Sequence, residues 1–327
     1  MKAILCKAFG PPSALVLEDV ASPELAGPRS VKIAVRSAGL NFPDVLMVQG
    51  KYQSKPPFPF TPGAEVAGTV VAIGTGVTAV KIGDRVMALC SVGGFAEDVV
   101  TADASVFPMP ASMSFEDASA FPLTYGTTYH ALVDRGALRA GETLLVTGAG
   151  GGVGLAAVQI GVALGARVIA AAGSKEKLDA ARAAGASETI DYTTESLLDR
   201  TRALTNDAGA DVIYEAVGGD VFDACLRGLA WGGRLLIVGF AGGRIPEIPA
   251  NRLLLRGASA VGVFWGSFAA RDPKANRANF ERLFELVAAG TLAPHIGARY
   301  ALADVARAMD DLADRKIVGK AIVTTGL

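Results

Sequence analysis

Histidine and cysteine are scarce in this chain of 327 residues. The two histidines are His130 and His295, and the three cysteines, Cys6, Cys90 and Cys225, stand far apart. Zinc sites are built mainly from closely spaced residues of these two types, so the usual structural and catalytic zinc sites are excluded and no metal is expected. An odd number of distant cysteines also argues against a disulfide framework and for a reducing compartment.

A serine hydrolase is disfavoured for the same reason. The sequence has no Gly-x-Ser-x-Gly elbow, and a catalytic triad would need one of the two histidines as its base. His130 stands in the apolar run Tyr129-His130-Ala131-Leu132, which is more typical of a buried histidine with a partner in the core. Hydride transfer, which needs little acid–base machinery, is the chemistry that remains.

An excess of one charge is also missing, because 31 Lys and Arg stand against 32 Asp and Glu, a net charge of −1. We therefore expect neither a nucleic-acid partner nor a basic membrane surface, and a small, partly apolar partner fits better. Hydrophobic residues make up 51% of the chain and charged residues 19%, as in a compact protein. At about 150 residues per domain, the length predicts two domains.

No segment has the pattern of a membrane span. The most apolar stretch, 153–172, is broken by Gln159 and Arg167 and divided by Gly165-Ala166. The N-terminus lacks the long apolar core of a signal peptide, because Lys7 interrupts it early. We therefore expect a cytoplasmic protein.

The pattern of apolar and turn-forming residues changes near residue 122. The first third has short apolar runs bounded by Gly, Pro and Asp, typical of a β-rich barrel or sandwich. From there on, short strands alternate with longer helices, the pattern of a doubly wound parallel sheet in an α/β fold. Expected strands are 143–147, 167–171, 188–190, 211–215, 234–239 and 258–264, with helices near 153–164, 175–184, 194–205, 219–229 and 273–289.

After Gly290 the pattern resembles that of the first third again, with a short strand, an amphipathic helix over 302–313 and a strand over 320–324. We therefore predict a β-rich domain formed by residues 1–122 and 291–327, and a nucleotide-binding domain formed by residues 123–290.

A glycine-rich loop links the expected strand 143–147 to the helix that follows. Its glycines include Gly148, Gly151 and Gly154, a variant of the dinucleotide fingerprint. Glycine lets the backbone approach a pyrophosphate closely, and the free N–H groups of the helix N-terminus point at the phosphates. A plain glycine turn is the alternative, but the strand-to-helix context and the βαβ units that follow favour dinucleotide binding.

The end of the second strand indicates which dinucleotide binds. NAD sites usually place an acid about 20 residues after the glycines, on the ribose 2′-OH, whereas here the first acid is Glu176, past the strand end. Ser174 and Lys177 can instead bond to a 2′-phosphate. NADPH is therefore the expected cofactor, and the alternative is that Lys175 and Lys177 merely solvate a helix start.

With these residues in hand, the chain resembles the zinc-free quinone oxidoreductase branch of the medium-chain dehydrogenase/reductase superfamily over nearly its whole length. In zinc-dependent relatives a cysteine and a histidine would stand where this chain has Leu40-Asn41 and Ala64. The segments that carry the resemblance are 39–44, 50–52, 62–68, 80–86, 93–97, 123–128, the glycine loop, 214–219, Gly239-Phe240 and Gly319-Lys320.

The resemblance implies a Rossmann-type NADPH-binding domain and a GroES-like catalytic domain, and it implies roles for single residues. The nicotinamide end would be surrounded by Asn41, Thr124, Thr128 and the loop Phe264-Trp265-Gly266, with Val217 and Gly239-Phe240-Ala241 on its far wall. Gly151, Gly152 and Val153 of the glycine loop complete the cofactor set, and the adenosine 2′-phosphate would be held by Gly173, Ser174, Lys177 and Tyr192.

The activity implied is hydride transfer to a quinone or conjugated enone, which leaves negative charge on an oxygen. Asn41 is a candidate to orient the nicotinamide or to donate to that oxygen, and Tyr52 is the nearest candidate proton donor. The alternatives are a turn-capping asparagine and a half-buried packing tyrosine. Some family members carry a second tyrosine where this chain has Leu46, so a two-tyrosine substrate site is not assumed.

Three other functions stay open. A 2-enoyl-CoA reductase is suggested by Arg271, Lys274 and Arg277, which could also be a solvated helix face. A crystallin-like protein that binds the cofactor with little turnover is the second. An alcohol dehydrogenase is the weakest, because polarising an alcohol normally uses zinc. The apolar strand near 259–264 is expected at a sheet edge, and in the family it pairs with its symmetry mate, so we expect a homodimer.

Overall fold

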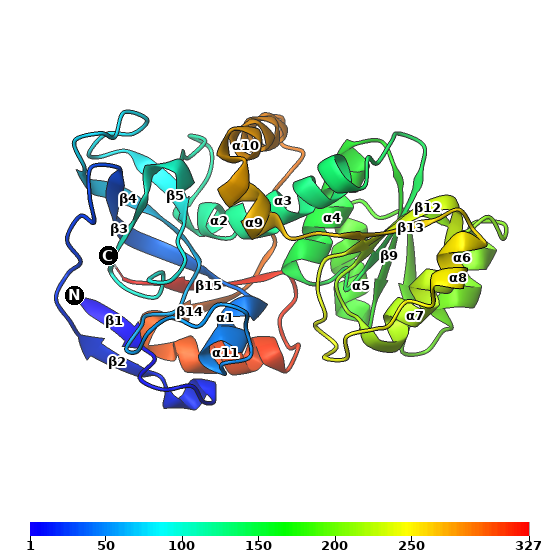
Figure 1. Cartoon of the computed structure of the whole chain (residues 1–327), viewed down its shortest axis with the longest axis horizontal. Coiled ribbons are helices and arrows are strands. Elements are labelled where there is room, and N and C mark those ends of the chain that lie inside the picture. Colours follow the sequence, from blue (N-terminus) through cyan, green and yellow to red (C-terminus); the bar gives the residue numbers. More distant parts are fainter. Residues whose placement is uncertain (327) are drawn as a thin grey trace. The chain divides into compact units, whose positions relative to one another are not determined.

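The computed structural model describes residues 1–326, which divide into two compact units (Figure 1). Unit 1 consists of Met1–Leu123 together with the chain from Pro294 onward, and unit 2 is the continuous segment Thr124–Ala293. The chain therefore passes between the units twice. Among the described residues, no helix has the length and apolar character that a membrane crossing requires.

Unit 2 is built on a sheet in which each strand runs parallel to its neighbours. Its spatial order is β10-β9-β8-β11-β12-β13, the order of doubly wound dinucleotide-binding sheets. The predicted fold class is confirmed. The strands are β8 (Thr143–Thr147), β9 (Arg167–Ala172), β10 (Glu188–Asp191), β11 (Ala210–Glu215), β12 (Leu229–Ile237) and β13 (Ser259–Gly262).

The helices expected in unit 2 are present close to their predicted places: α4 (Gly152–Ala163), α5 (Lys175–Ala183), α6 (Leu197–Leu204), α7 (Gly219–Arg227) and α10 (Pro273–Ala288). Four further elements were not predicted: α3 (Pro122–Tyr129), the π-helical turn His130–Arg135 that continues it, α8 (Ala250–Leu254) and α9 (Trp265–Arg271). Helix α3 contains the first passage of the chain from unit 1 to unit 2.

Two boundaries differ from the prediction for identifiable reasons. Strand β12 begins at Leu229, earlier than expected, because its register against β11 shifts at a bulge where Gly232 adopts a positive φ of 71°. Strand β13 ends at Gly262, so the expected strand 258–264 is too long, and Trp265 already begins α9. The Trp265 indole is buried and donates a hydrogen bond to Asn276 Oδ1 at 3.0 Å, which holds this turn in helical form.

Unit 1 contains a sheet of the order β14-β15-β3-β4-β5-β7, and β6 also pairs with β3. Neighbours are antiparallel except β14 and β15. The strands are β3 (Ser30–Leu40), β4 (Glu65–Ile73), β5 (Arg85–Leu89), β6 (Asp98–Ala102), β7 (Val106–Pro108), β14 (Ile296–Ala301) and β15 (Lys320–Thr324). A separate hairpin joins β1 (Lys2–Leu5) to β2 (Val16–Asp19), and the helices are α1 (Phe42–Val48), α2 (Phe115–Ser119) and α11 (Val305–Ala313).

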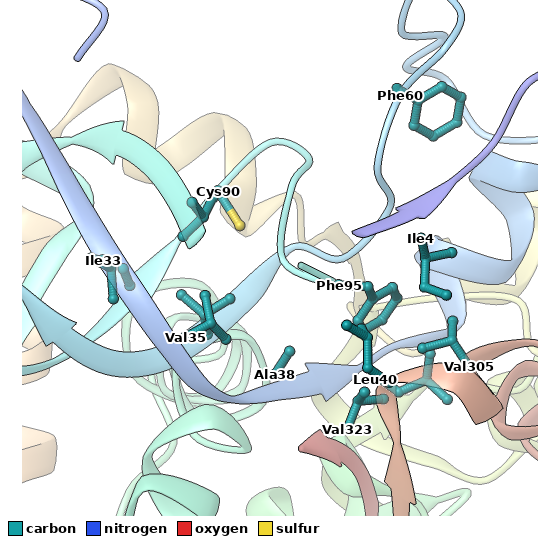
Figure 2. Close-up of a cluster of buried hydrophobic side chains, with 14 of the residues drawn as sticks. Ile4, Ile33, Val35, Ala38, Leu40, Phe60, Cys90, Phe95, Val305 and Val323 are labelled. Carbon is teal, nitrogen blue, oxygen red and sulfur yellow. The ribbon is translucent and has the colours of Figure 1, made fainter. Parts of the chain in front are cut away.

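Strand β3 forms the centre of the unit 1 core. Its inward residues include Ile33 and Val35 and, past a register shift near Arg36, Ala38 and Leu40. The shift moves the apolar core side chains of the strand from odd to even positions, because one extra residue reverses the alternation of a strand. Figure 2 shows Leu40 beside Phe95 and near side chains from β1, β15 and α11, while Ile33 and Val35 lie further along β3. The C-terminal strand β15, predicted at 320–324, thus completes a core that begins near the N-terminus.

Candidate cofactor site and active site

The glycine loop lies at the point where the order of the unit 2 sheet reverses. Strands β8 and β11 are neighbours there, although β9 and β10 come between them in sequence. In sheets of this kind ligands bind beyond the carboxyl ends of the strands at this point. Strand β8 ends at Thr147, and residues 148–151 lead into α4, whose N-cap is Gly151. The N–H groups at this helix start are suited to a pyrophosphate.

Close packing explains why the loop needs glycine. Gly148 adopts a positive φ of 59°, and a Cβ on Gly154 would lie 2.2 Å from the Gly148 carbonyl oxygen. A Cβ on Gly150 would lie 2.3 Å from Cβ and 2.9 Å from Cα of Lys177. The last contact places the loop directly against the first turn of α5.

The residues expected to hold a 2′-phosphate come together at the end of β9. Ser174 is the N-cap of α5, and its hydroxyl accepts a hydrogen bond from the backbone N–H of Lys177. The ring of Tyr192 lies over Gly173, where an added Cβ would be 3.1 Å from Tyr192 Cε2. Gly173, Ser174, Lys177 and Tyr192 therefore form one group, and Gly150 of the glycine loop touches it.

A buried carboxylate shapes the loop after β11. Glu215 ends this strand and is fully buried. It accepts hydrogen bonds from the backbone N–H groups of Val217 (2.8 Å) and Gly218 (2.9 Å) and from the Thr147 hydroxyl (3.2 Å). Burial raises the pKa of Glu215, while these hydrogen bonds act in the opposite direction. Glu215 thus ties the ends of β8 and β11 together.

The loop after β12 is joined to the same place. The backbone N–H of Ala241 donates to the Ala216 carbonyl at 3.1 Å, and that of Gly242 donates to the Val217 carbonyl at 2.6 Å. These two hydrogen bonds bring Val217 and the predicted residues 239–241 side by side.

The remaining candidates of unit 2 lie on α3 and at the start of α9. Thr124 and Thr128 are buried, and the Thr128 hydroxyl lies 3.1 Å from that of Tyr214 and 3.3 Å from the Val153 carbonyl oxygen. The indole of Trp265 packs against α3, where an added Cβ on Gly126 would lie 2.5 Å from it. Phe264, by contrast, is 61% exposed, and nothing lies within 4 Å of the Cβ position of Gly266.

In unit 1 the candidate Asn41 belongs to a buried polar cluster. Its Oδ1 accepts a hydrogen bond from Lys320 Nζ at 2.7 Å, and its Nδ2 donates to Glu65 Oε1 at 2.8 Å. Lys320 and Glu65 form an ion pair of 2.6 Å, and both are buried. Both the oxygen and the nitrogen of the Asn41 side-chain amide are therefore hydrogen-bonded to other residues of unit 1.

Asp44 interacts with this cluster, and the charge of Asp44 in turn acts on Tyr52. Asp44 is buried, accepts a hydrogen bond from the Asn41 backbone N–H at 2.8 Å, and has its pKa raised to about 7, chiefly by burial. Tyr52 packs against the core of unit 1, and burial, followed by the nearby Asp44, raises the pKa of its phenol. Tyr52 therefore keeps its proton at neutral pH.

No role was predicted for Glu65, Lys320, Thr147 or Glu215. Their signal in the sequence is a charged or polar residue within an apolar strand, as in Lys320-Ala321-Ile322-Val323. Such a residue needs a buried partner. Because that partner is far away in the sequence, the pattern predicts that a buried partner exists but does not identify the residue. His130, expected to be a satisfied core histidine, is buried, and its Nδ1 lies 2.7 Å from Asp134 Oδ2.

Comparison with known proteins identifies the family. Residues 27–111 match the family model described as alcohol dehydrogenase GroES-like domain, and residues 152–289 match the model described as zinc-binding dehydrogenase. The quinone oxidoreductase-like protein 2 homolog of Nematostella vectensis is 44% identical over 99% of this chain and 89% of its own. The chain belongs to the quinone oxidoreductase branch of the medium-chain dehydrogenase/reductase superfamily. The resemblance drawn from the sequence is confirmed.

Solved structures of this superfamily have the same fold. The quinone oxidoreductase of Pseudomonas syringae has a TM-score of 0.91 at 34% identity and covers 99% of both chains. That of Escherichia coli, complexed with NADPH, has a TM-score of 0.91 at 27% identity, covering 99% of this chain and 100% of its own. The chain is thus a medium-chain oxidoreductase with the nucleotide-binding fold of its nicotinamide-dependent relatives.

The raised pKa of Asp44 predicts a pH-dependent stability of this medium-chain oxidoreductase. An acid whose pKa is higher in the folded than in the unfolded state favours folding at low pH, and this contribution is lost as the pH rises to the folded pKa of about 7. Replacing Asp44 by Asn removes the titration. Urea unfolding at several pH values should show wild-type stability falling relative to Asp44→Asn between about pH 5 and pH 7 and levelling off above pH 7.

The matched control is Asp311→Asn in the same unit. Hydrogen bonds from Lys316 and Tyr300 lower the pKa of Asp311, so its contribution is complete above about pH 5 and should stay constant over the same range. A difference between wild type and Asp44→Asn that does not change with pH would contradict the assignment.

Proposed function

We propose that this protein is an NADPH-dependent oxidoreductase that transfers hydride to a quinone or conjugated enone without a metal ion. The observation that carries the proposal is the group of Gly173, Ser174, Lys177 and Tyr192, packed against the glycine loop at the end of β9. Relatives named quinone oxidoreductase, one of them solved with NADPH, support the same function.

The residues present fit the cofactor. Gly150 and Gly154 leave no room for a side chain of their own, so the loop keeps the bare backbone that close approach of a pyrophosphate needs. Beyond β9, the first acid along the chain is the exposed Glu176, while Ser174 and Lys177 offer a hydroxyl and an ammonium. Glycine-loop N–H groups would bind the pyrophosphate, and Lys177, Ser174 and Tyr192 would hold the 2′-phosphate. When bound, the reduced nicotinamide supplies the hydride.

Unit 1 supplies the polar groups of the proposed chemistry. Asn41 is oriented by Lys320 and Glu65 and is proposed to face the reacting end of the cofactor. Tyr52, whose phenol is protonated at neutral pH, is proposed to donate that proton to the oxygen of the acceptor after hydride transfer. Thr128 and the residues 264–266 are proposed to position the nicotinamide.

A metal ion has no evident role in this proposal. Among the described residues, no group of three or more His, Cys, Asp or Glu side chains is arranged to hold one. Quinones and conjugated enones are already electron-poor at the carbon that receives hydride, so a donor to the developing oxygen charge suffices. The three cysteines are free and buried, in keeping with the proposed cytoplasmic location.

Lys177 should determine the preference for the phosphorylated cofactor. Replacing Lys177 by Ala is expected to raise the dissociation constant of NADPH about tenfold or more, since a hydrogen bond to a charged group contributes about 1.5–3 kcal/mol, and to leave NADH binding unchanged. Isothermal titration calorimetry measures both constants.

Lys175→Ala is the control, because this neighbouring lysine is 86% exposed and pairs with Asp179. It should bind NADPH like the wild type. Equal affinity of the wild type for NADPH and NADH would rule out the proposed cofactor.

Purified protein should oxidise NADPH in the presence of members of a panel of quinones and conjugated enones. Replacing Tyr52 by Phe is expected to lower kcat with an enone on the order of a hundredfold, without changing NADPH affinity. Tyr300→Phe serves as control, since Tyr300 packs against the same core and its hydroxyl donates to Asp311. Failure with every acceptor would defeat the proposed reaction, and full activity of Tyr52→Phe would defeat only the role of Tyr52.

We also propose a homodimer formed through β13, which lies at the edge of the unit 2 sheet. Unpaired edges favour association, and large apolar side chains are exposed nearby in sequence and space. Trp231 is 79% exposed and Leu254 78%, and the Trp231 ring lies 3.6 Å from the Cβ position of Gly257.

Light scattering should give twice the mass of one chain. The double substitution Trp231→Asp and Leu254→Asp should shift the protein to the mass of one chain, because it places charges on the proposed contact. Ile82→Asp, at an apolar residue of unit 1 that is 63% exposed, should leave the mass unchanged. A wild type with the mass of one chain would contradict the proposal.

A further inference from the structure

The buried cluster of unit 1 contains an ion pair that has no role in the chemical steps of the proposed reaction. Lys320 Nζ donates to Leu40 O at 2.9 Å, to Asn41 Oδ1 at 2.7 Å and to Glu65 Oε1 at 2.6 Å. An ammonium group has three donors, so all of them are used. Lys320 is thus saturated and has no hydrogen left for a substrate or cofactor.

The ion pair decides which way the Asn41 amide points. An amide offers an acceptor at one end and donors at the other, and turning it around exchanges them. The Lys320 ammonium can only donate and the Glu65 carboxylate can only accept, so Oδ1 must face Lys320 and Nδ2 must face Glu65. The second Nδ2 hydrogen faces the Gly39 carbonyl oxygen at 3.4 Å.

The other oxygen of Glu65 reaches the start of α3. Glu65 Oε2 accepts a hydrogen bond from the Leu123 backbone N–H at 2.8 Å, in the first turn of that helix. A carboxylate at a helix N-terminus is favourable because it meets unpaired N–H groups. The helix then carries Thr124 and Thr128. A Cβ on Gly39 would lie 2.4 Å from Glu65 Oε1, so glycine is needed for the carboxylate to sit there.

Stability alone does not require these charges. Replacing a buried ion pair by apolar residues of similar volume is often neutral or stabilising, whereas removing one partner is strongly destabilising. A pair kept in the core with every hydrogen bond satisfied is well suited to specify an arrangement.

We propose that Glu65 and Lys320 are positioning residues for turnover, whose ion pair fixes the orientation of the Asn41 amide and the start of α3. This inference rests on the proposed function, in which Asn41 belongs to the active site.

The decisive comparison is between Lys320→Met and the double variant Glu65→Gln/Lys320→Met. The single variant leaves a buried carboxylate without its cation and should unfold at a lower urea concentration. The double variant is neutral, so its unfolding midpoint should return toward that of the wild type. A Gln at position 65 no longer dictates the orientation of Asn41, because its amide both donates and accepts.

In the double variant kcat should fall about ten- to a hundredfold, because small misplacements of active-site groups have effects of this size, while the NADPH dissociation constant stays within about threefold of wild type. Lys316→Met is the matched control, since Lys316 is an exposed lysine paired with Asp311 and Asp314, and it should leave kcat unchanged. A stable double variant with wild-type kcat would overturn the proposal and reduce the pair to a structural role.

A second measurement needs no turnover. The chain has five asparagines, at 41, 206, 251, 276 and 279, so selective ¹⁵N-asparagine labelling gives five side-chain amide pairs in an NMR spectrum. In the wild type the Asn41 pair should exchange hydrogen more slowly than those of the exposed Asn206 and Asn251, and this protection should be lost in Lys320→Met and in the double variant.

Fast exchange of the Asn41 amide in the wild type would overturn the proposed positioning even if every variant failed to fold. If instead the wild type neither binds nor oxidises NADPH, the proposed function fails while the amide measurement still reports on the arrangement. The two failures are therefore distinguishable.

Discussion

The buried ion pair between Glu65 and Lys320 holds together parts of unit 1 that are far apart in the sequence. Glu65 begins β4, Lys320 begins β15, and their shared partner Asn41 follows β3. A buried charge is costly unless every one of its hydrogen bonds is satisfied. The observed pairing of these strands satisfies all three donors of Lys320. The contact therefore stabilises the register of β15 against β3 and the entry into α1.

In unit 2 a buried carboxylate also connects the ends of two strands, but no cation among the described residues is paired with it. Glu215 is as deeply buried as Glu65, but its partners are backbone N–H groups and a hydroxyl instead of a cation. Burial therefore raises its pKa. In both units a carboxylate at one end of a strand organises the turn from which candidate functional residues project, which are Asn41 in unit 1 and Val217 in unit 2.

Local patterns predicted the parts of this protein that depend on local interactions. The strand, glycine loop and helix around residues 143–163 and the strand 320–324 follow from apolar periodicity and turn residues. The start of α9 does not, because it depends on burial of Trp265 against α3. The cluster around Glu65 was also missed, since its partners are separated by up to 280 positions. Sequence spacing carries no information on such contacts.

Unit 1 is made from both ends of the chain, and this has a consequence for the order in which the protein is assembled. Strand β15 pairs with β3 but is synthesised near the end, 255 positions after Glu65. Unit 2 is continuous and has all of its strands once residue 293 has left the ribosome. Domains generally fold in the order of synthesis, but here the middle segment can finish before the first. Until residues 320–324 have been synthesised, residues 37–40 of β3 lack the partner strand that completes the unit 1 core.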